Sequence, residues 1–335
     1  MLTHIAQAAL GALFCAVAVA VLTGGVRAGL VRIGIHDTPN ARSSHTVVKP
    51  RGGGLAVLAI VLPAWLLAGW LTSGSLPVTL VGLTVFVAGV SFIDDVAGVR
   101  ALWRLGAQAA AVFAGLAALD PEPLLPELLP LWLERGTIAL AWLWFVNLYN
   151  FMDGIDGITA VETGSVAAGV GLVWLVVGPG ADDVLLPWLL AGAAVGFLWW
   201  NWAPSKIFLG DVGSVPLGFA LGWLLLDLAS HGALAAALIL PGYYLLDATL
   251  TLILRLLRGE KVWRAHKQHA YQRAVQRGRS HAAVATRVAA VNALLIGCAL
   301  WSVVGQPVAA GMVAALIVAG LWGSLRFRGG KAARA

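Results

Sequence analysis

The sequence predicts an all-α integral membrane protein, folded as a single polytopic domain over residues 1–335 with about eleven transmembrane helices. Hydrophobic residues make up 60% of the chain and charged residues 11%, and the mean hydropathy is +0.86. A soluble protein of this size would need far more polar surface. Most of the chain falls into apolar stretches of about 15–24 residues, long enough to cross a bilayer as helices. The two cysteines, Cys15 and Cys298, lie inside such stretches and do not suggest a disulfide framework.

The distribution of basic residues predicts an N-terminus outside and a cytoplasmic C-terminus. No Lys or Arg precedes the first apolar run, so the N-terminus does not resemble a signal peptide, and Arg27 and Arg32 follow that run. In this orientation all of the 22 lysines and arginines except Arg135 lie on the cytoplasmic side, as the positive-inside rule expects. The expected spans are roughly 5–26, 53–71, 77–94, 101–119, 136–151, 158–178, 184–202, 214–230, 233–255, 284–304 and 307–326.

Polar residues concentrate on the predicted cytoplasmic side, which is where we expect the functional site. The loop HDTPNARSSHTVVKPRGGG, residues 36–54, interleaves basic and hydroxyl groups before three glycines. Glycines let backbone amides approach a phosphate closely, although a basic loop with a flexible exit explains the composition equally well. The loops expected to carry catalysis are about 32–52, 94–104, 150–158, 203–214 and 256–283.

Adjacent acids stand at the end of the third predicted span. Asp94 and Asp95 repel each other and lose solvation at a membrane boundary, and a divalent cation would remove both costs. Carboxylate oxygens suit Mg²⁺ or Mn²⁺. The alternative is a pair of solvated loop acids beside Arg100 and Arg104.

The stretch VNLYNFMDGIDG, residues 146–157, places four polar side chains at three-residue intervals. Asn147 and Asn150 fall on one helical face, and the glycines that follow present Asp153 and Asp156 in a loop. Amides can bind phosphate or sugar hydroxyls and can ligate a metal through oxygen. A polar helix end with a glycine cap would explain one of these residues but not all four.

Two further loops complete the set. PSKIFLGDVGS, residues 204–214, offers Lys206, a Gly-Asp turn and Ser214 at a helix start, where an anion can bind, and Asp211 could hold a metal beside it. In residues 255–281, His266 and His269 share a helical face within a basic segment. That segment could instead rest on anionic lipid headgroups, or the histidines could bind zinc. Together these loops suit a Mg²⁺–diphosphate substrate and a lipid partner at the membrane surface.

The ordered motifs DTPNARSSH with PRGGG, DDV, NLYNFMDGIDG, FLGDVGS and HKQHAYQR resemble the polyprenyl-phosphate N-acetylaminosugar-1-phosphate transferase superfamily, glycosyltransferase family 4, which includes the bacterial MraY and WecA enzymes. The resemblance covers nearly the whole chain. It implies Mg²⁺-dependent transfer of sugar-1-phosphate from a UDP-N-acetylaminosugar to undecaprenyl phosphate, releasing UMP, at the cytoplasmic face of the bacterial inner membrane. It assigns Asp94 and Asp95 as the catalytic pair, Asp211, Asn150 and Asp94 as metal ligands, and Asn147, Asp153, Asp156, Lys206, His266, His269 and Arg51 as substrate contacts.

Several alternatives stay open at this stage. HKQHAYQR lacks the three consecutive histidines of the murein-precursor branch and resembles the branch that initiates O-antigen or capsular glycans, while a peptidoglycan-precursor transferase remains the alternative. An Asp of the 94/95 pair could deprotonate the lipid phosphate or form a covalent phospho-enzyme.

Other classes of protein explain the sequence less well. A transporter should place its acids mid-span, and only Asp227 and Asp247 lie within predicted spans. An intramembrane aspartyl protease would need two facing acids inside the bilayer. Nothing points to nucleic acid, and no residue pattern specifies a homodimer.

Overall fold

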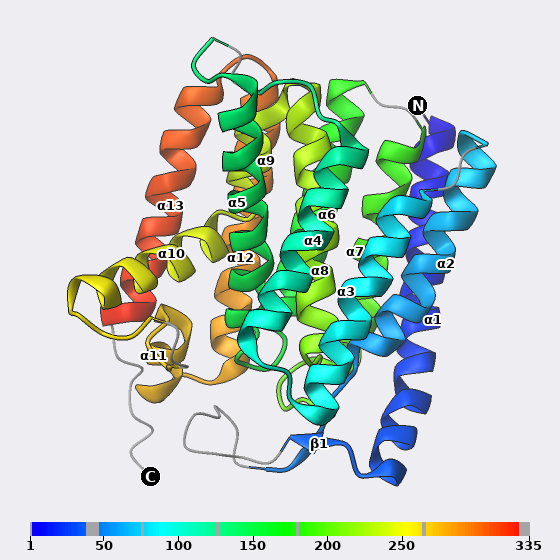
Figure 1. The fold of residues 1–335 in the computed structure, drawn as a ribbon, viewed down its shortest axis with the longest axis vertical. Helices are drawn as coiled ribbons and strands as arrows, with labels where there is room; N and C mark the ends of the chain where they lie inside the picture. Colours follow the sequence, from blue (N-terminus) through cyan, green and yellow to red (C-terminus); the bar gives the residue numbers. More distant parts are fainter. Residues whose placement is uncertain are drawn as a thin grey trace.

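The computed structural model describes residues 2–37, 47–74, 77–124, 127–178, 181–262 and 266–327, and Figure 1 shows a bundle of long helices. The helices are α1 (Leu2–Ile33), α2 (Gly54–Thr72), α3 (Val78–Ala97), α4 (Ala101–Leu119), α5 (Leu131–Phe151), α6 (Ile158–Val177), α7 (Ala181–Asn201), α8 (Asp211–Leu228), η1 (Ala229–Ala233), α9 (Leu234–Ile239), α10 (Gly242–Leu257), α11 (Ala270–Gln276), α12 (His281–Val303) and α13 (Pro307–Phe327). The only sheet within the described ranges pairs β1 (His36–Asp37) with β2 (Lys49–Pro50), antiparallel.

The prediction of an all-α membrane protein agrees with this architecture. Within the described part of the chain, nine helical stretches are long and apolar enough to cross a membrane. The helix containing the fifth predicted span, α5, is not among them, and it begins at Leu131 rather than near residue 136. α1 begins and α13 ends toward opposite ends of the bundle, as an odd number of crossings requires (Figure 1). Eleven crossings and the orientation stay predictions.

The ninth predicted span, 233–255, is not one continuous helix. His231 and Gly232 leave the helical conformation, Gly232 with φ of 87°, and α9 then packs back against α8 and against α12. The helix breaks again after Leu240, and α10 leaves the direction of the bundle (Figure 1). Pro241 stands at this second break and cannot donate the backbone hydrogen bond that a continuous helix needs. The two breaks direct the end of α10 toward the loop that carries the histidines.

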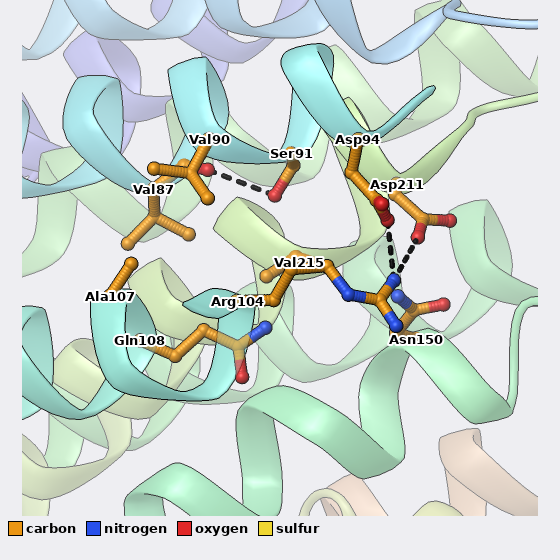
Figure 2. Close-up of a pocket in the computed structure, with 10 residues that line it drawn as sticks. All are labelled: Val87, Val90, Ser91, Asp94, Arg104, Ala107, Gln108, Asn150, Asp211 and Val215. Atoms are coloured by element: carbon orange, nitrogen blue, oxygen red, sulfur yellow. Dashed lines mark hydrogen bonds and ion pairs between the residues drawn. The ribbon is translucent and has the colours of Figure 1, made fainter. Parts of the chain in front are cut away.

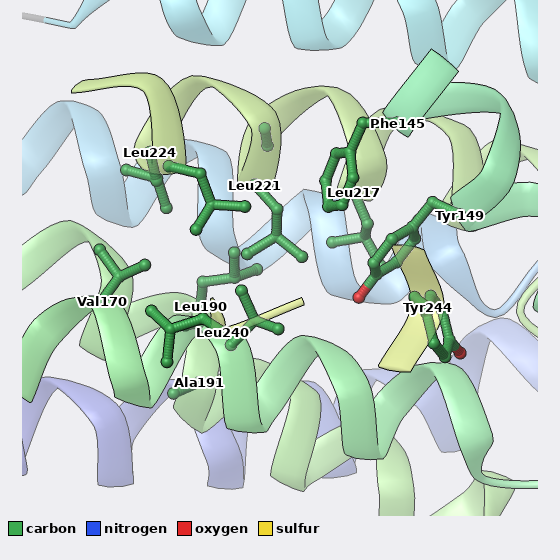
Figure 3. Packing of buried hydrophobic residues seen from close by; sticks show 14 of the residues in the cluster. Phe145, Tyr149, Val170, Leu190, Ala191, Leu217, Leu221, Leu224, Leu240 and Tyr244 are labelled. Atoms are coloured by element: carbon green, nitrogen blue, oxygen red, sulfur yellow. The ribbon is translucent and has the colours of Figure 1, made fainter. Parts of the chain in front are cut away.

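The core forms around α8, which is apolar on all sides and almost entirely buried. Figure 3 shows leucines of α8 packing beside Phe145 and Tyr149 of α5, and Tyr149 in turn contacts Tyr244 of α10. In a bilayer, association between such helices depends on close packing, because lipid tails are as apolar as leucine. A buried α8 therefore fixes the position of its first residue, Asp211, relative to α3 and α5.

Segments that are distant in sequence meet at the end of the bundle where α8 begins. In β1 and β2, His36 lies opposite Pro50 and Asp37 opposite Lys49, and Arg51 forms a bridge with Phe208. α3 and α5 end, and α12 begins, toward this end of the bundle (Figure 1). The described parts of the predicted functional loops thus gather at one end of the molecule.

Candidate active site

Three carboxylates and two guanidinium groups form a cluster where α3 and α8 meet. Arg51 places Nη2 2.8 Å from Asp95 Oδ1 and 2.5 Å from Asp211 Oδ1. Arg104 of α4 forms an ion pair with Asp94 and lies 3.6 Å from Asp211 Oδ2. The acids thus outnumber the cations by one, which leaves the group attractive to a further cation. We call these five residues the acid–arginine cluster.

The two adjacent aspartates play different parts in this cluster. Asp95 accepts backbone N–H groups from Asp211 (3.2 Å) and Val212 (2.9 Å) at the start of α8, where a negative charge stabilises the helix. Asp94 accepts only one backbone N–H, from Val99 at 2.7 Å, and its other oxygen meets Arg104. Asp95 therefore holds α8 in place, whereas Asp94 is held largely by a side chain that can move.

Asp94 faces a small pocket that it shares with Asn150, Asp211, Arg104 and Gln108 (Figure 2). The cavity measures about 20 Å³, on the scale of one water molecule. Figure 2 shows Arg104 reaching across this space toward both carboxylates. A nucleotide sugar does not fit inside the cavity, so it must bind over the pocket mouth or displace Arg104.

The pocket offers the oxygen donors with which proteins commonly bind magnesium beside a phosphate substrate. Asp94 and Asp211 supply carboxylate oxygens, and the Asn150 amide makes no hydrogen bond to another described residue. Among the described residues, no three His, Cys, Asp or Glu side chains are arranged as a ready-made metal cage. Mg²⁺ commonly uses one or two carboxylates with substrate phosphates and water completing its shell. The donor set therefore fits the predicted ligands Asp94, Asn150 and Asp211.

The other members of the VNLYNFMDGIDG stretch face different surroundings. Asn147 lies on α5 one turn before Asn150, and its amide donates to Gln108 Oε1 (2.9 Å) and to the Leu143 carbonyl (2.8 Å). Asp153 lies just beyond α5. Burial raises the pKa of its carboxyl to about 7, a hydrogen bond from Thr159 opposes the shift, and the Asp211 carboxylate adds to it. Asp153 is thus the candidate residue closest to titrating near neutral pH.

Asp156 is occupied by structural contacts. It accepts the Ser205 backbone N–H at 3.1 Å and the Ser205 hydroxyl at 2.8 Å, and it lies 3.7 Å from Lys49 Nζ and 3.3 Å from His281 Nδ1. Burial disfavours the carboxylate, but the bonds from His281 and Ser205 prevail and hold the pKa of Asp156 below its usual range. Asp156 thus joins the segments of Lys49, Ser205 and His281, and it does not line the pocket of Asp94 and Asn150.

The two lysines near the site, Lys206 and Lys49, have different surroundings. Lys206 is exposed, and its ammonium lies 5.3 Å from the centre of the Trp200 ring rather than in the acid–arginine cluster. Lys49 is the lysine on this side of the site, 2.9 Å from Ser205 Oγ. Sequence reasoning missed Lys49 and His281, although Lys49 stands two residues before Arg51, where strand alternation puts both side chains on one face.

The glycines of PRGGG serve packing instead of cradling a phosphate. The amides of Gly52 and Gly53 donate to the Phe208 carbonyl at 3.1 and 2.8 Å, and the Gly54 amide donates to the Leu209 carbonyl at 2.9 Å. A Cβ on Gly54 would lie 2.2 Å from Gly213 Cα, so only glycine lets α2 approach α8 here. Residues 38–45 of DTPNARSSH, and residues 263–265 of the histidine segment, lie outside the described residues.

The helix start at Asp211 also differs from the prediction. Asp211 is the first residue of α8, and Ser214, which we expected at the helix start, lies buried within its first turn. The Ser214 hydroxyl donates to the Gly210 carbonyl at 3.3 Å. The anion site expected at Ser214 is therefore closed, and the helix start presents Asp211 instead.

Asp247 anchors the histidine loop. It is fully buried and accepts the Ala270 backbone N–H at 2.8 Å, the Tyr243 hydroxyl at 3.1 Å and the Thr251 hydroxyl at 3.2 Å. The acid thus caps α11 from a distance in sequence. Arg255, which lies on the same helix as Asp247, pairs with Glu260 at 2.8 Å.

The two predicted histidines lie together beside this anchor. Their ring centres are 4.8 Å apart, His269 is buried, and His266 is partly exposed. Burial lowers the pKa of each ring to about 4, with a nearby positive charge from Arg255 adding to the effect. Both rings are therefore neutral at pH 7. Among the described residues no third ligand completes the zinc site considered from sequence.

One contact joins the histidine loop to the pocket. The Tyr271 hydroxyl donates to the Phe151 carbonyl at 3.0 Å, at the end of the helix that carries Asn150. A Cβ on Gly154 would lie 2.2 Å from that hydroxyl oxygen. Gly154 thus allows α11 to pack directly against the turn after α5, which places the histidines beside the turn that carries Asp153.

Comparison with known proteins gives a consistent result. Residues 77–229 match Glycosyl transferase family 4. A probable undecaprenyl-phosphate N-acetylglucosaminyl 1-phosphate transferase of Bacillus subtilis is 29% identical over 277 residues, which cover 78% of this chain and 76% of the relative. A decaprenyl-phosphate N-acetylglucosaminephosphotransferase of Mycobacterium tuberculosis is 30% identical over 352 residues, covering 89% and 84%. A phospho-N-acetylmuramoyl-pentapeptide-transferase of Mycolicibacterium smegmatis is 34% identical over 217 residues, but these cover 50% of this chain and 60% of the relative.

Proposed function

The chain belongs to the polyprenyl-phosphate aminosugar-1-phosphate transferase superfamily, and from this premise we propose that it transfers sugar-1-phosphate from a UDP-N-acetylaminosugar to undecaprenyl phosphate. The products are undecaprenyl-diphospho-sugar and UMP. The observation that carries the proposal is the meeting of Asp94, Asp211 and Asn150 in one pocket, with Arg51 and Arg104 beside them.

The reaction exchanges one phosphoryl linkage for another. An oxygen of the acceptor phosphate forms a bond to the phosphorus that carries the sugar, and the bond from that phosphorus to the bridging oxygen breaks, so that its electron pair leaves with UMP. A bound Mg²⁺ would neutralise diphosphate charge during this exchange. Arg51 and Arg104 provide guanidinium groups that can bind phosphate oxygens in pairs once they release the carboxylates.

We propose direct attack by the acceptor, with Asp94 as the residue that orients its phosphate or accepts a proton from it. Asp95 is the less suitable of the pair, because two backbone N–H groups of α8 and Arg51 occupy its oxygens. A phosphate monoester has a second pKa near 6, so the attacking oxygen is already largely ionised at neutral pH. This makes a covalent Asp phospho-enzyme unnecessary.

The substrate preference that we propose is an N-acetylaminosugar without a peptide, as in the first step of O-antigen, capsule or a similar surface glycan. Relatives named for N-acetylglucosamine transfer match 78–89% of the chain, whereas the pentapeptide transferase matches 50%. The motif HKQHAYQR supports the same choice. The site then lies on the cytoplasmic face of the bacterial inner membrane, in keeping with the positive-inside pattern.

The direct test is UMP release by the purified protein. Mg²⁺, undecaprenyl phosphate and a panel of UDP-N-acetylaminosugars are supplied, together with the UDP-linked pentapeptide precursor. We expect UMP from at least one peptide-free sugar, only when both the lipid and Mg²⁺ are present, and none from the Asp94→Asn variant. Failure of every sugar to yield UMP would contradict the proposed function. Preferential use of the pentapeptide precursor would instead assign the protein to the peptidoglycan branch.

A further inference from the structure

An apolar groove lies between α9, α10 and α13, away from the pocket that holds Asp94. Its volume is about 590 Å³, and it shares no lining residue with that pocket. Leu238 of α9, Leu250 and Ile253 of α10 and Val318 of α13 are among the residues that line it. A groove of this kind on a membrane protein is shaped for a hydrocarbon chain.

One face of α13 continues from this groove toward the end of the bundle that holds the acid–arginine cluster. Ala315 and Val318 line the groove, and Trp322 and Arg326 follow at four-residue intervals. Residues spaced in this way lie on one face of a helix. At about 1.5 Å of rise per residue, Arg326 lies roughly 12 Å beyond Val318. The face thus passes from apolar lining to an aromatic N–H donor and then to a cation.

Among the described residues, Trp322 has no hydrogen-bond partner for its N–H, and Arg326 has no carboxylate partner. Trp322 Nε1 is buried and makes no hydrogen bond within the described part of the chain. Arg326 is only 4% exposed, its guanidinium lies over Trp322 and Phe327, and its hydrogen bond to the Gln268 carbonyl is long, 3.4 Å. No carboxylate pairs with it among the described residues, and the sequences 263–265 and 328–335 contain no Asp or Glu.

The surroundings of Arg326 add positive charge. Arg258, Arg273 and Arg277 are close enough to repel it. Asp247 is the acid that attracts Arg326, and it already binds α11. Glu260, which attracts Arg273, binds Arg255 and Gln268. Exposed cations would satisfy the positive-inside rule without difficulty, but a buried guanidinium without a counter-ion loses solvation. Arg326 and the arginines around it could therefore bind an anion from outside the chain.

We propose that the groove and the cluster of Arg326, Arg273, Arg258 and Arg277 bind one anionic phospholipid of the adjoining leaflet. Its acyl chain lies between α10 and α13, and its phosphate accepts hydrogen bonds from Arg326 and Trp322. Basic pockets between transmembrane helices recognise lipid headgroups in this way, and charge-assisted bonds to phosphate are strong. A second copy of the chain suits the cluster poorly, because it would bring like charges together. The polyprenyl acceptor is the competing occupant, but its phosphate must reach Asp94 in a different pocket and would then leave Arg326 without an anion.

This site extends beyond the transfer reaction, and its expected role is to steady the histidine loop. Arg326 and Arg273 both contact Gln268, which lies between His266 and His269. Neutralising the arginine cluster would remove the repulsion next to that loop. Bound lipid should accordingly raise the thermal midpoint of the purified protein.

Native mass spectrometry of the full chain, with phosphatidylglycerol or phosphatidylcholine added to the delipidated protein, tests the proposal. We expect one phosphatidylglycerol to be retained roughly tenfold more strongly than phosphatidylcholine. Arg326→Gln should remove that preference. Ala315→Phe, which fills the exposed groove and leaves every arginine in place, should reduce retention of both lipids. Arg287→Gln is the matched control, because Arg287 is exposed and bonds to its own helix.

Three outcomes would overturn the proposal. The first is equal retention of the two lipids by the unmodified chain. The second is an unchanged preference in both Arg326→Gln and Ala315→Phe. The third is stoichiometric displacement of phosphatidylglycerol by undecaprenyl phosphate, which would make the groove an acceptor site. UMP release is not the readout, so failure here and failure of the proposed function are distinguishable.

Discussion

Carboxylates at the site end of the molecule divide into two groups that bind different partners. Asp94 and Asp211 face the pocket and are neutralised mainly by the side chains of Arg104 and Arg51. Asp95, Asp156 and Asp247 each accept at least one backbone N–H group from a distant segment. A side chain can be displaced by a metal or a phosphate, whereas a backbone amide cannot leave without unfolding its segment. The comparison separates acids available for chemistry from acids that hold the site together.

The largest expected effect is loss of turnover in a pocket acid. Asp211→Asn should reduce the rate of UMP release by roughly 10³-fold, because it weakens the oxygen ligand that we propose Asp211 supplies to Mg²⁺ where phosphoryl charge develops. The thermal midpoint should change little, since the substitution also relieves repulsion among three carboxylates. Parallel measurement of initial rates and melting checks this. A rate within a few-fold of the unmodified protein would remove Asp211 from the pocket acids.

An anchoring acid should behave in the opposite way. Asp247→Asn removes an acceptor for the α11 amides and places an amide group among buried donors, which should cost about 2–4 kcal/mol of stability. Circular dichroism melts in detergent measure the loss. Asp120→Asn is the control, because Asp120 pairs with Arg135 in an exposed ion pair, which contributes little. Equal midpoints for both variants would contradict the anchoring role.

The pH dependence of stability provides a third, smaller test. Since burial lowers the pKa of His269 to about 4, the unfolded chain binds a proton at higher pH than the folded chain does. The contribution of buried, neutral His269 to the free energy of unfolding is therefore complete above about pH 6.5, and it is lost as the pH falls toward 4. Between pH 7 and pH 5 we expect a loss of about 2 kcal/mol. Melting curves of His269→Gln, recorded between pH 7 and pH 5, should show a shallower dependence of the thermal midpoint on pH, and an unchanged dependence would contradict this prediction.

The smallest expected effect concerns the lysine that sequence reasoning favoured. Lys206→Gln should leave kcat/KM within about threefold, because its ammonium lies over Trp200 on an exposed surface and is weakly coupled to the site. Arg51→Gln, by contrast, should lower kcat/KM by roughly 10²-fold or more through loss of a charge-assisted contact with phosphate. Steady-state kinetics decide between them. A loss of kcat/KM well beyond threefold for Lys206→Gln would instead support Lys206 as a substrate contact.

Much of the fold and the pocket could be predicted from sequence. Hydropathy predicted most of the helices, and the ordered motifs predicted that Asp94, Asn150 and Asp211 lie together, as they do in the pocket. The breaks at Gly232 and Pro241 were harder to predict, because a hydropathy window detects an apolar run but not a change in helix direction.

The division between the two kinds of acid could not be predicted, and the reason is physical. Asp94 and Asp95 are neighbours on one helix, so they point about 100° apart, and only the packing of α3 against α8 decides which one meets the helix start. Asp247 is separated from Ala270 by a loop whose path the sequence does not specify. The role of Lys49 depends likewise on a short β pairing that composition does not reveal.

The adjacent aspartates test the central claim most directly, because they share a helix turn and differ only in partners. Turnover and thermal midpoint would be measured on the same preparations of Asp94→Asn and Asp95→Asn, with saturating UDP-sugar and lipid. We predict that Asp94→Asn loses turnover while its midpoint stays near that of the unmodified protein. Asp95→Asn should lose both, because the start of α8 loses its charged acceptor. Equal midpoints for the two variants would contradict the division between pocket acids and anchoring acids.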